Sequence, residues 1–195
     1  MCGIAGVINP EIKEKDGVIR EMVSRIFHRG PDEDGFFIDE NVALGMRRLS
    51  IIDLSTGKQP ITSADDKTLI FLNGEIYNYK ELKRDLESKG YKFKTQTDTE
   101  VILHMFEEYG ENMLLKLRGM FAFSIYNKET RDIFIARDFF GIKPLYYLKD
   151  KEKIVAFSSE VKSLLVYPNF ETVINDAAVY NYLAFQYNPL QTFCT

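Results

Sequence analysis

The spacing of apolar residues changes part-way along this chain, and that change limits what it can fold into. Before about Met120, short apolar segments are interleaved with amphipathic stretches whose apolar residues recur at helical spacing. From Met120 onward, apolar residues recur at every second position, as in strands joined by short turns. The helices are therefore grouped between strands instead of following each strand in turn. This order predicts an α+β fold and not regular βαβ winding.

The same patterns predict the individual elements. We expect strands at Gly3–Asn9, Gly35–Ile38, Val42–Met46, Thr68–Leu72, Phe121–Tyr126, Asp132–Arg137, Lys143–Tyr147 and Ile154–Ser158. We expect helices at Lys13–Phe27, Tyr79–Lys89, Thr97–Tyr109, Glu160–Leu165 and Asn175–Phe185. The strand that begins at Thr68 is expected to stop at Asn73-Gly74. The helix that begins at Thr97 has a capping-box spacing to Glu100 and is expected to stop at Gly110.

The composition is that of a folded chain with a sizeable core. Of the 195 residues, 45% are hydrophobic and 13% are aromatic, which excludes a disordered or fibrous chain. The 25 Lys and Arg residues and the 29 Asp and Glu residues give a net charge of −4. No basic field is present to hold a phosphate backbone, so we expect no nucleic acid as a partner.

Cysteine and histidine are scarce, which limits metal and disulfide chemistry. Cys2 and Cys194 are the only cysteines and stand at opposite ends of the chain, and the two histidines, His28 and His104, are too far apart for a His-x-x-x-His motif. We therefore expect no metal site and no disulfide scaffold. No apolar run approaches the roughly 18–20 residues that a bilayer span needs, and the N-terminus lacks the pattern of a signal peptide. We accordingly expect a cytoplasmic protein without a membrane partner.

The second residue carries the most informative chemistry. If the initiator Met is removed, Cys2 becomes N-terminal and carries both a thiol and an α-amine. An α-amine has an ordinary pKa of about 7.7–8.0, against about 10.4 for a lysine, so it can act as a general base for its own thiol near neutral pH. The alternative is that Cys2 is a small residue without a role. Gly3 and the strand that begins there favour a fixed terminus instead of a frayed one.

Three further positions fit a nucleophile that attacks the amide of an amino acid. Asn73-Gly74 follows a strand and offers a side-chain amide and an unhindered backbone N–H to an oxyanion, although the same dipeptide is a strong hairpin signal. Arg48 suits bidentate binding of a carboxylate, or else it forms a surface salt bridge. Asp98 suits an ammonium group, or else it caps its helix.

A series of short motifs runs in order from residue 2 to about residue 165. They are Cys2-Gly3-Ile4-Ala5-Gly6, His28-Arg29-Gly30-Pro31-Asp32, Arg48-Leu49-Ser50-Ile51-Ile52-Asp53, Asn73-Gly74-Glu75-Ile76-Tyr77-Asn78, Thr97-Asp98-Thr99-Glu100, Gly119-Met120-Phe121-Ala122-Phe123 and Arg137-Asp138 through Gly141-Ile142-Lys143-Pro144-Leu145-Tyr146. In these motifs and their order, the chain resembles the class II glutamine amidotransferases. It looks most like the N-terminal glutaminase domain of glutamine-hydrolysing asparagine synthetases.

The resemblance implies a fold and a set of roles. The fold is that of the N-terminal-nucleophile (Ntn) hydrolases, with four αββα layers in which two packed antiparallel sheets lie between helical layers. Cys2 would attack the side-chain amide of glutamine, with its α-amine carrying the proton and with Asn73 and Gly74 holding the oxyanion. Arg48 would bind the substrate carboxylate. The other residues that the resemblance implies at the site are Ile51 and Ile52 beside Arg48, Glu75 and Asp98 at the ammonium group, and Arg29 as a support for Cys2.

The resemblance also sets the expected domains, cofactors and partners. We expect residues 2–171 to form the amidotransferase domain and residues 172–195 to start the link to a C-terminal synthetase domain that this sequence lacks. ATP and Mg²⁺ are expected only in that domain, where ammonia amidates aspartate. Glutamine and the synthetase domain of the same chain are the expected partners, and a homodimer is left open. The alternatives are the same glutaminase feeding another acceptor, or a non-catalytic module that binds glutamine or a partner domain if Met1 is retained.

Overall fold

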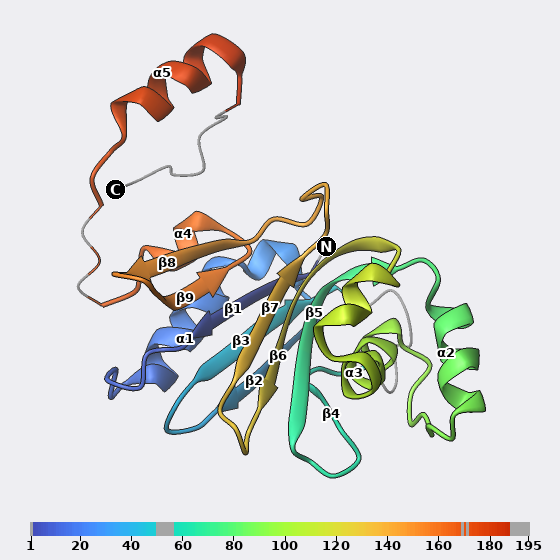
Figure 1. Cartoon of the computed structure of the whole chain (residues 1–195). Coiled ribbons are helices and arrows are strands. Elements are labelled where there is room, and N and C mark those ends of the chain that lie inside the picture. The colour runs from blue at the N-terminus through green and yellow to red at the C-terminus, as the bar shows by residue number, and fades with distance from the viewer. Residues whose placement is uncertain (1, 50–56, 169, 171, 188–195) are drawn as a thin grey trace.

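Two antiparallel β-sheets pack face to face in the computed structural model, which describes residues 2–49, 57–168, 170 and 172–187 (Figure 1). The five-stranded sheet has the order β2-β3-β1-β9-β8, and the four-stranded sheet has the order β4-β5-β6-β7. The strands of the first sheet are β1 Gly3–Val7, β2 Glu33–Ile38, β3 Ala43–Arg48, β8 Tyr146–Asp150 and β9 Lys153–Ser158. Those of the second sheet are β4 Ile61–Thr62, β5 Thr68–Ile76, β6 Gly119–Asn127 and β7 Ile133–Arg137.

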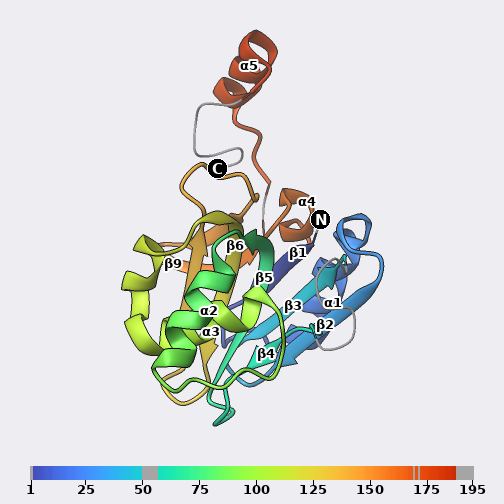
Figure 2. The same ribbon diagram turned by 90° about the vertical axis from the view of Figure 1, so that its right-hand side faces the viewer.

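Helices cover the outer face of each sheet. The five-stranded sheet carries α1 Lys15–Arg25, which the short 3-10 turn η1 Phe27–Arg29 follows, and α4 Val161–Leu164. The four-stranded sheet carries α2 Tyr79–Ser88, α3 Asp98–Tyr109 and the 3-10 turn η2 Gly110–Leu115 (Figure 2). The layers follow the order helices, sheet, sheet, helices, so the predicted α+β fold with four αββα layers is confirmed.

Strand β5 shows how period-two alternation builds two cores at once. Leu69 and Phe71 point toward the facing sheet, where they pack with Ile4 of β1. Ile70 and Leu72 point the other way and pack under α2 and α3. Because both faces of the strand are buried, its register is strongly specified. The strand therefore holds the residues near its end at fixed positions.

Polar residues fix the start of α3. The hydroxyl of Thr97 is the N-cap and accepts the backbone N–H of Glu100 at 3.3 Å. The predicted capping box is only half formed, because the Glu100 carboxylate accepts the N–H groups of Lys94 and Thr95 at 2.8 and 2.6 Å instead of that of Thr97. The predicted stop at Gly110 is confirmed, and its φ of 55° is a conformation that favours glycine.

The prediction that β5 stops at Asn73-Gly74 is wrong. The strand continues to Ile76, with Asn73 opposite Ala122 and Gly74 opposite Phe121 of β6. A dipeptide that is common in hairpin turns is here the interior of a paired strand. The hairpin interpretation of Asn73-Gly74 is therefore also wrong.

The structure differs from the predicted strands at two other places. β8 begins at Tyr146 and not at Lys143, because the Asp138 carboxylate accepts the N–H groups of Ile142 and Lys143 and holds them in a turn. β4 was not predicted, since Ile61–Thr62 is too short to show a period-two pattern. The other predicted strands and helices are present, with ends that shift by a few residues.

Helix α5, Asp176–Phe185, begins where it was predicted to begin. The Asn175 side chain accepts the N–H of Ala178 at 3.2 Å. The helix stands away from the four layers in both views (Figures 1 and 2), and its large side chains are mostly exposed. In the part of the chain that the structure describes, no helix is both long enough and apolar enough to cross a membrane.

Candidate active site

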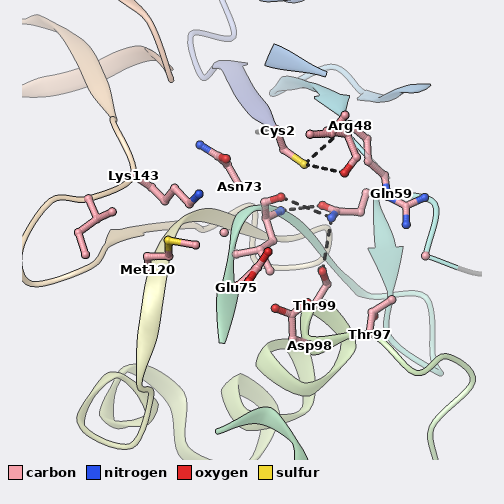
Figure 3. Close-up of a pocket in the computed structure, with 15 residues that line it drawn as sticks. Cys2, Arg48, Gln59, Asn73, Glu75, Thr97, Asp98, Thr99, Met120 and Lys143 are labelled. Atoms are coloured by element: carbon pink, nitrogen blue, oxygen red, sulfur yellow. Dashed lines mark hydrogen bonds between the residues drawn. The ribbon is translucent and has the colours of Figure 1, made fainter. Parts of the chain in front are cut away.

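One pocket, of about 240 Å³, gathers most of the residues that the sequence motifs pointed to (Figure 3). It opens where β1 and β3 of one sheet meet the end of β5 and the start of α3. The predicted site residues that line it are Cys2, Arg48, Asn73, Gly74, Glu75 and Asp98. The predicted residues Ile51 and Ile52 lie outside the described part of the chain.

Cys2 stands immediately before β1, the central strand of the five-stranded sheet. The backbone of Leu49 holds its sulfur from both sides, because the Leu49 N–H donates to Sγ at 3.4 Å and the thiol donates to the Leu49 carbonyl at 3.7 Å. The side chain is partly buried and packs against the core between the sheets. The thiol is therefore fixed at one wall of the pocket, as Figure 3 shows.

Arg29 does not line the pocket but holds Cys2 from behind. Its Nε donates to the Cys2 carbonyl oxygen at 2.9 Å, and its Nη1 donates to the carboxylate of Glu160 at 3.1 Å. His28 and Lys162 contact the same carboxylate at 2.8 and 3.2 Å. Burial opposes the charge of Glu160, but the hydrogen bonds from these three side chains outweigh it and lower the pKa of Glu160. Glu160 thus anchors the arginine that fixes the backbone of Cys2.

The end of β5 brings an amide and a backbone N–H to the pocket. Asn73 is fully buried and lies beside Cys2 in Figure 3. Backbone N–H groups alternate between the two edges of a strand. The N–H of Leu72 donates to Gln59 Oε1 at 2.7 Å and that of Ile76 donates to Asp98 Oδ2 at 2.9 Å, both away from β6. The N–H of Gly74 lies between them on the same edge and therefore faces the pocket.

Gly74 is required by a close approach and not by an unusual dihedral angle. A Cβ atom at this position would lie 2.3 Å from the Met120 carbonyl oxygen and 2.6 Å from the Phe121 Cα atom of the neighbouring strand. Such distances are far inside van der Waals contact, so a larger residue would push β5 away from β6. The strand pair therefore stays tight at the point where the pocket needs a backbone donor.

Asp98 and Glu75 form the acidic end of the pocket. Asp98 is 5% exposed, and its carboxylate accepts the Ile76 N–H, so it joins α3 to β5. Burial raises the pKa of Asp98, and the charge of Glu75 raises it further. Asp98 is not the N-cap residue, which is Thr97, but it lies in the first turn of α3, where its carboxylate accepts the Thr99 N–H. Two neighbouring carboxylates in a small pocket favour a cationic group between them.

Arg48 ends β3 on the other side of the pocket. It is buried, and its Nη1 donates to the Glu33 carboxylate at 2.7 Å. The ion pair that the sequence left open does exist: its Arg48 side is buried and lines the pocket, while its Glu33 side is partly exposed. Glu33 fixes the direction of the Arg48 side chain.

Comparison with known proteins identifies the family of the chain. The family model described as a glutamine amidotransferase domain matches residues 1–194. The chain belongs to the glutamine amidotransferase family. This amidotransferase domain is 48% identical over 193 residues to the glutamine-hydrolyzing asparagine synthetase 1 of Bacillus subtilis (strain 168), covering 97% of this chain and 30% of that protein. It is 41% identical over 167 residues to the glutamine-hydrolyzing asparagine synthetase 2 of Oryza sativa subsp. japonica, covering 84% of this chain and 28% of that protein.

The amidotransferase domain thus spans less than a third of the length of these curated relatives. Two solved structures are similar in fold. The glutamine phosphoribosylpyrophosphate amidotransferase of B. subtilis gives a TM-score of 0.68 at 23% identity, and a structure described as the allosteric regulatory enzyme of purine biosynthesis gives 0.70 at 22%. Each match covers 85% of this chain and 43% of the other. At this identity the two structures support the fold alone.

Sequence reasoning missed several residues that build the amidotransferase pocket. Gln59 ties three elements together, because its Oε1 accepts the Leu72 N–H at 2.7 Å and its Nε2 donates to Thr99 Oγ1 at 3.4 Å (Figure 3). Ser159 and Glu160 lie behind Asn73 and Cys2. No motif marks such residues, since each acts through partners that are distant in the sequence. For Ser159 and Glu160, the sequence offered one signal, which is their position directly after a predicted strand.

The described residues of the amidotransferase domain contain no cluster of three or more His, Cys, Asp or Glu side chains that could hold a metal ion. The polar side chains at the pocket include the thiol of Cys2, two amides, two carboxylates, the guanidinium of Arg48, the ammonium group of Lys143 and two threonine hydroxyls. These groups suit nucleophilic attack on an uncharged amide whose remote end carries both a carboxylate and an ammonium group.

Proposed function

We propose that this domain hydrolyses the side-chain amide of glutamine to glutamate and ammonia, with Cys2 as the nucleophile. The observation that carries the proposal is the arrangement of the pocket. The Cys2 thiol, the Asn73 side-chain amide and the Gly74 backbone N–H lie at one end, and the Asp98 carboxylate lies at the other. The membership of the glutamine amidotransferase family supports the choice of substrate.

The proposed reaction begins when the Cys2 thiol adds to the side-chain carbonyl carbon of glutamine. The thiol proton passes to the α-amine of the same residue, directly or through one water molecule. Asn73 Nδ2 and the Gly74 N–H stabilise the oxyanion that forms. The carbon–nitrogen bond then breaks, and the amine returns the proton to the departing ammonia. Water adds to the remaining thioester, and glutamate leaves with the thiol restored.

The remaining pocket residues would bind the amino-acid end of glutamine. We assign the substrate carboxylate to Arg48, with the backbone of Ile51 and Ile52 beside it. We assign the ammonium group to Asp98 and Glu75, whose carboxylates lie together at the far wall. An ammonium group there would also relieve the repulsion between the two carboxylates. Arg29 has no contact with substrate in this scheme and acts by fixing the Cys2 carbonyl.

Removal of Met1 is a condition of the mechanism. If Met1 stays attached, the α-amine belongs to the wrong residue, and the domain would bind glutamine or a partner domain without turnover. The intact mass of the purified chain distinguishes the two forms by one Met residue.

The decisive experiment compares three forms of the processed chain. The parent is expected to release glutamate from glutamine and to be labelled at Cys2 by an electrophilic glutamine analogue. Cys2→Ala is expected to lose glutamate release by at least about three orders of magnitude. A form with one alanine added before Cys2 keeps the thiol but displaces the amine, so it is expected to be inactive as well. Equal glutamate release from Cys2→Ala and the parent would overturn the assignment of the nucleophile.

We further propose that residues 2–171 are the glutaminase half of an asparagine synthetase, with residues 172–195 leading toward a synthetase domain. That domain, and not the present one, would use ATP and Mg²⁺ to amidate aspartate. Phe139 and Phe140 are 95% and 84% exposed next to Ile142 and Lys143 at the pocket, which suits a surface that another domain covers. The second candidate is the same glutaminase with a different ammonia acceptor. We propose a cytoplasmic location because the two distant cysteines give no disulfide scaffold.

A further inference from the structure

Asn73 has one side-chain atom whose surroundings do not match its chemistry. The residue is fully buried, and its Nδ2 lies 3.5 Å from the hydroxyl of Ser159. Its Oδ1 is buried without a hydrogen-bond partner among the described residues. Buried carbonyl oxygens are almost always paired in folded proteins, so this atom calls for a physical explanation.

The hydroxyl of Ser159, in turn, lacks an acceptor for its own proton among the described residues. Its Oγ accepts the N–H of Ile4 at 2.9 Å, and in this orientation of the amide it also accepts from Asn73 Nδ2. A serine hydroxyl has one donor and two acceptor positions, so both acceptor positions are used. No described group then accepts the Ser159 proton.

A half-turn of the Asn73 amide resolves both problems at once. Such a turn exchanges the oxygen and the nitrogen with little change of shape. Oδ1 then accepts the Ser159 O–H, while Ser159 still accepts the Ile4 N–H. Nδ2 is turned away from Ser159 toward the space beside Cys2, where it can donate to an oxyanion (Figure 3).

We propose that Ser159 is a positioning residue that orients the Asn73 amide so that Nδ2, and not Oδ1, faces the reacting carbonyl. This inference rests on the proposed glutaminase function and adds a residue to it. Ser159 also joins the two parts of the site, since its backbone N–H donates to the Ile4 carbonyl at 2.8 Å. One residue thus connects β1, which follows the nucleophile, to the amide that stabilises the oxyanion.

The neighbouring residue supplies a matched control. Ser158 is as fully buried as Ser159, and its hydroxyl donates to the Ile4 carbonyl at 3.3 Å and accepts the backbone N–H of Glu160 at 3.4 Å. Both serines therefore tie the end of β9 to the same residue of β1. Only the hydroxyl of Ser159 contacts Asn73. Ser158→Ala and Ser159→Ala should cost similar stability, but only the second should disturb the orientation of the amide.

The test measures kcat, KM and Tm for both variants in the processed chain. Ser159→Ala is expected to lower kcat about 10- to 100-fold with little change in KM, because the misaligned donor acts on the transition state. Ser158→Ala is expected to change kcat less than about twofold at a similar Tm. Equal values of kcat for the two variants would overturn the proposal.

A double-variant measurement separates positioning from a general structural effect. If Ser159 acts through Asn73, then adding Ser159→Ala to Asn73→Ala should not lower kcat further. If the two effects multiply, Ser159 acts by another route and the proposal is wrong.

The orientation of the Asn73 amide can also be determined by a method that does not depend on an activity assay. A neutron structure of the parent chain shows on which side of Asn73 the exchangeable deuterons lie. The proposal expects them on the side facing the pocket, and deuterons facing Ser159 would overturn it. A parent that releases no glutamate would contradict the proposed function, while the neutron result would still decide the orientation of the amide.

Discussion

Asp98 combines burial, one backbone hydrogen bond and a carboxylate neighbour, and these contacts predict how it responds to substitution. Asp98→Asn can still accept the Ile76 N–H, so the fold should survive. The variant loses the negative charge that we assign to the substrate ammonium group. A hydrogen bond to a charged group contributes about 1.5–3 kcal/mol, so the KM for glutamine should rise about 10- to 100-fold. Steady-state kinetics would show this rise, with a smaller change in kcat.

The same carboxylate predicts a pH dependence. Burial and Glu75 raise the pKa of Asp98, so it becomes protonated at a higher pH than the ordinary value of about 3.9. On acidification the KM of the parent should therefore rise before ordinary aspartates titrate, and this rise should vanish in Asp98→Asn. Asp132→Asn, at an exposed position after the β6–β7 turn, is the control and should behave like the parent. A KM in Asp98→Asn that matches the parent at neutral pH would refute the assignment.

At the residue scale, the sequence predicted those positions whose chemical type is itself the signal. A cysteine at position 2, an Asn-Gly pair and an aspartate at a helix start all suit one reaction, and all lie at one pocket. Ser159 and Gln59 could not be predicted in this way. A serine or a glutamine fits many environments, and their roles come only from partners that folding brings close.

At the element scale, the space around two glycines predicts opposite effects of Gly→Ala substitution. Gly74 lies in the tight pair of β5 with β6, and Gly17 lies on the open side of α1. Gly74→Ala places a methyl group against the backbone of Met120 and Phe121, so overpacking should cost about 1–3 kcal/mol. For a chain of this size, that cost lowers the Tm by roughly 2–12 °C. Gly17→Ala in α1 meets no atom within 4 Å and should raise the Tm by about 1–4 °C. Calorimetry on both variants provides the check, and a Gly74→Ala chain as stable as the parent would contradict this packing.

Helix α3 carries a buried ionic cluster that predicts a pH-dependent stability. His104 Nδ1 lies 2.7 Å from Glu107, and His104 Nε2 lies 3.8 Å from the carboxylate of Glu100. Burial opposes the charge on His104, but the two carboxylates outweigh it and raise its pKa to about 9. Because this pKa is raised above the ordinary value of about 6.5, the stabilisation is complete below about pH 6.5 and is lost as the pH rises through about 9.

His104→Gln should therefore lower the free energy of unfolding by at most about 3 kcal/mol at pH 6, and by much less at pH 9.5. Urea unfolding at the two pH values measures this difference. His28→Gln changes an exposed histidine and should cost no more than about 1 kcal/mol at pH 6. A His104→Gln effect that is equal at both pH values would show that the cluster does not depend on a charged histidine.

The elements themselves were largely visible in the sequence, because period-two and helical spacings report which face is buried. The end of β5 was not, since the local preference of Asn-Gly for turns competes with nine paired positions along β6. Pairing with a neighbouring strand decided the outcome. The error fell at the residues that we assign to the oxyanion, where a functional requirement overrides a local preference.

At the scale of the whole molecule, the pattern predicted the α+β class and the family resemblance implied the four layers, but neither predicted the order of the strands. β1 lies between β3 and β9, so the strand next to the nucleophile pairs with segments from both halves of the chain. Apolar spacing predicts that a strand is buried but not which strands are its neighbours. The site is therefore assembled by long-range pairing: β1 brings Cys2, β3 brings Arg48, and β9 leads to Ser159.

The arrangement of the four layers also predicts that they are stable without α5. Ala178 is the only residue of this helix that is buried, whereas Tyr180 and Leu183 are 73% and 70% exposed. A chain that ends after residue 171 should therefore keep its Tm within about 2 °C, the shift expected for a change of under about 1 kcal/mol. It should also release glutamate at the rate of the longer chain, because every residue of the pocket precedes residue 171. Calorimetry and a glutamate assay on the two chains test the proposed boundary, and a fall in Tm of more than about 4 °C would mean that α5 is part of the folded domain.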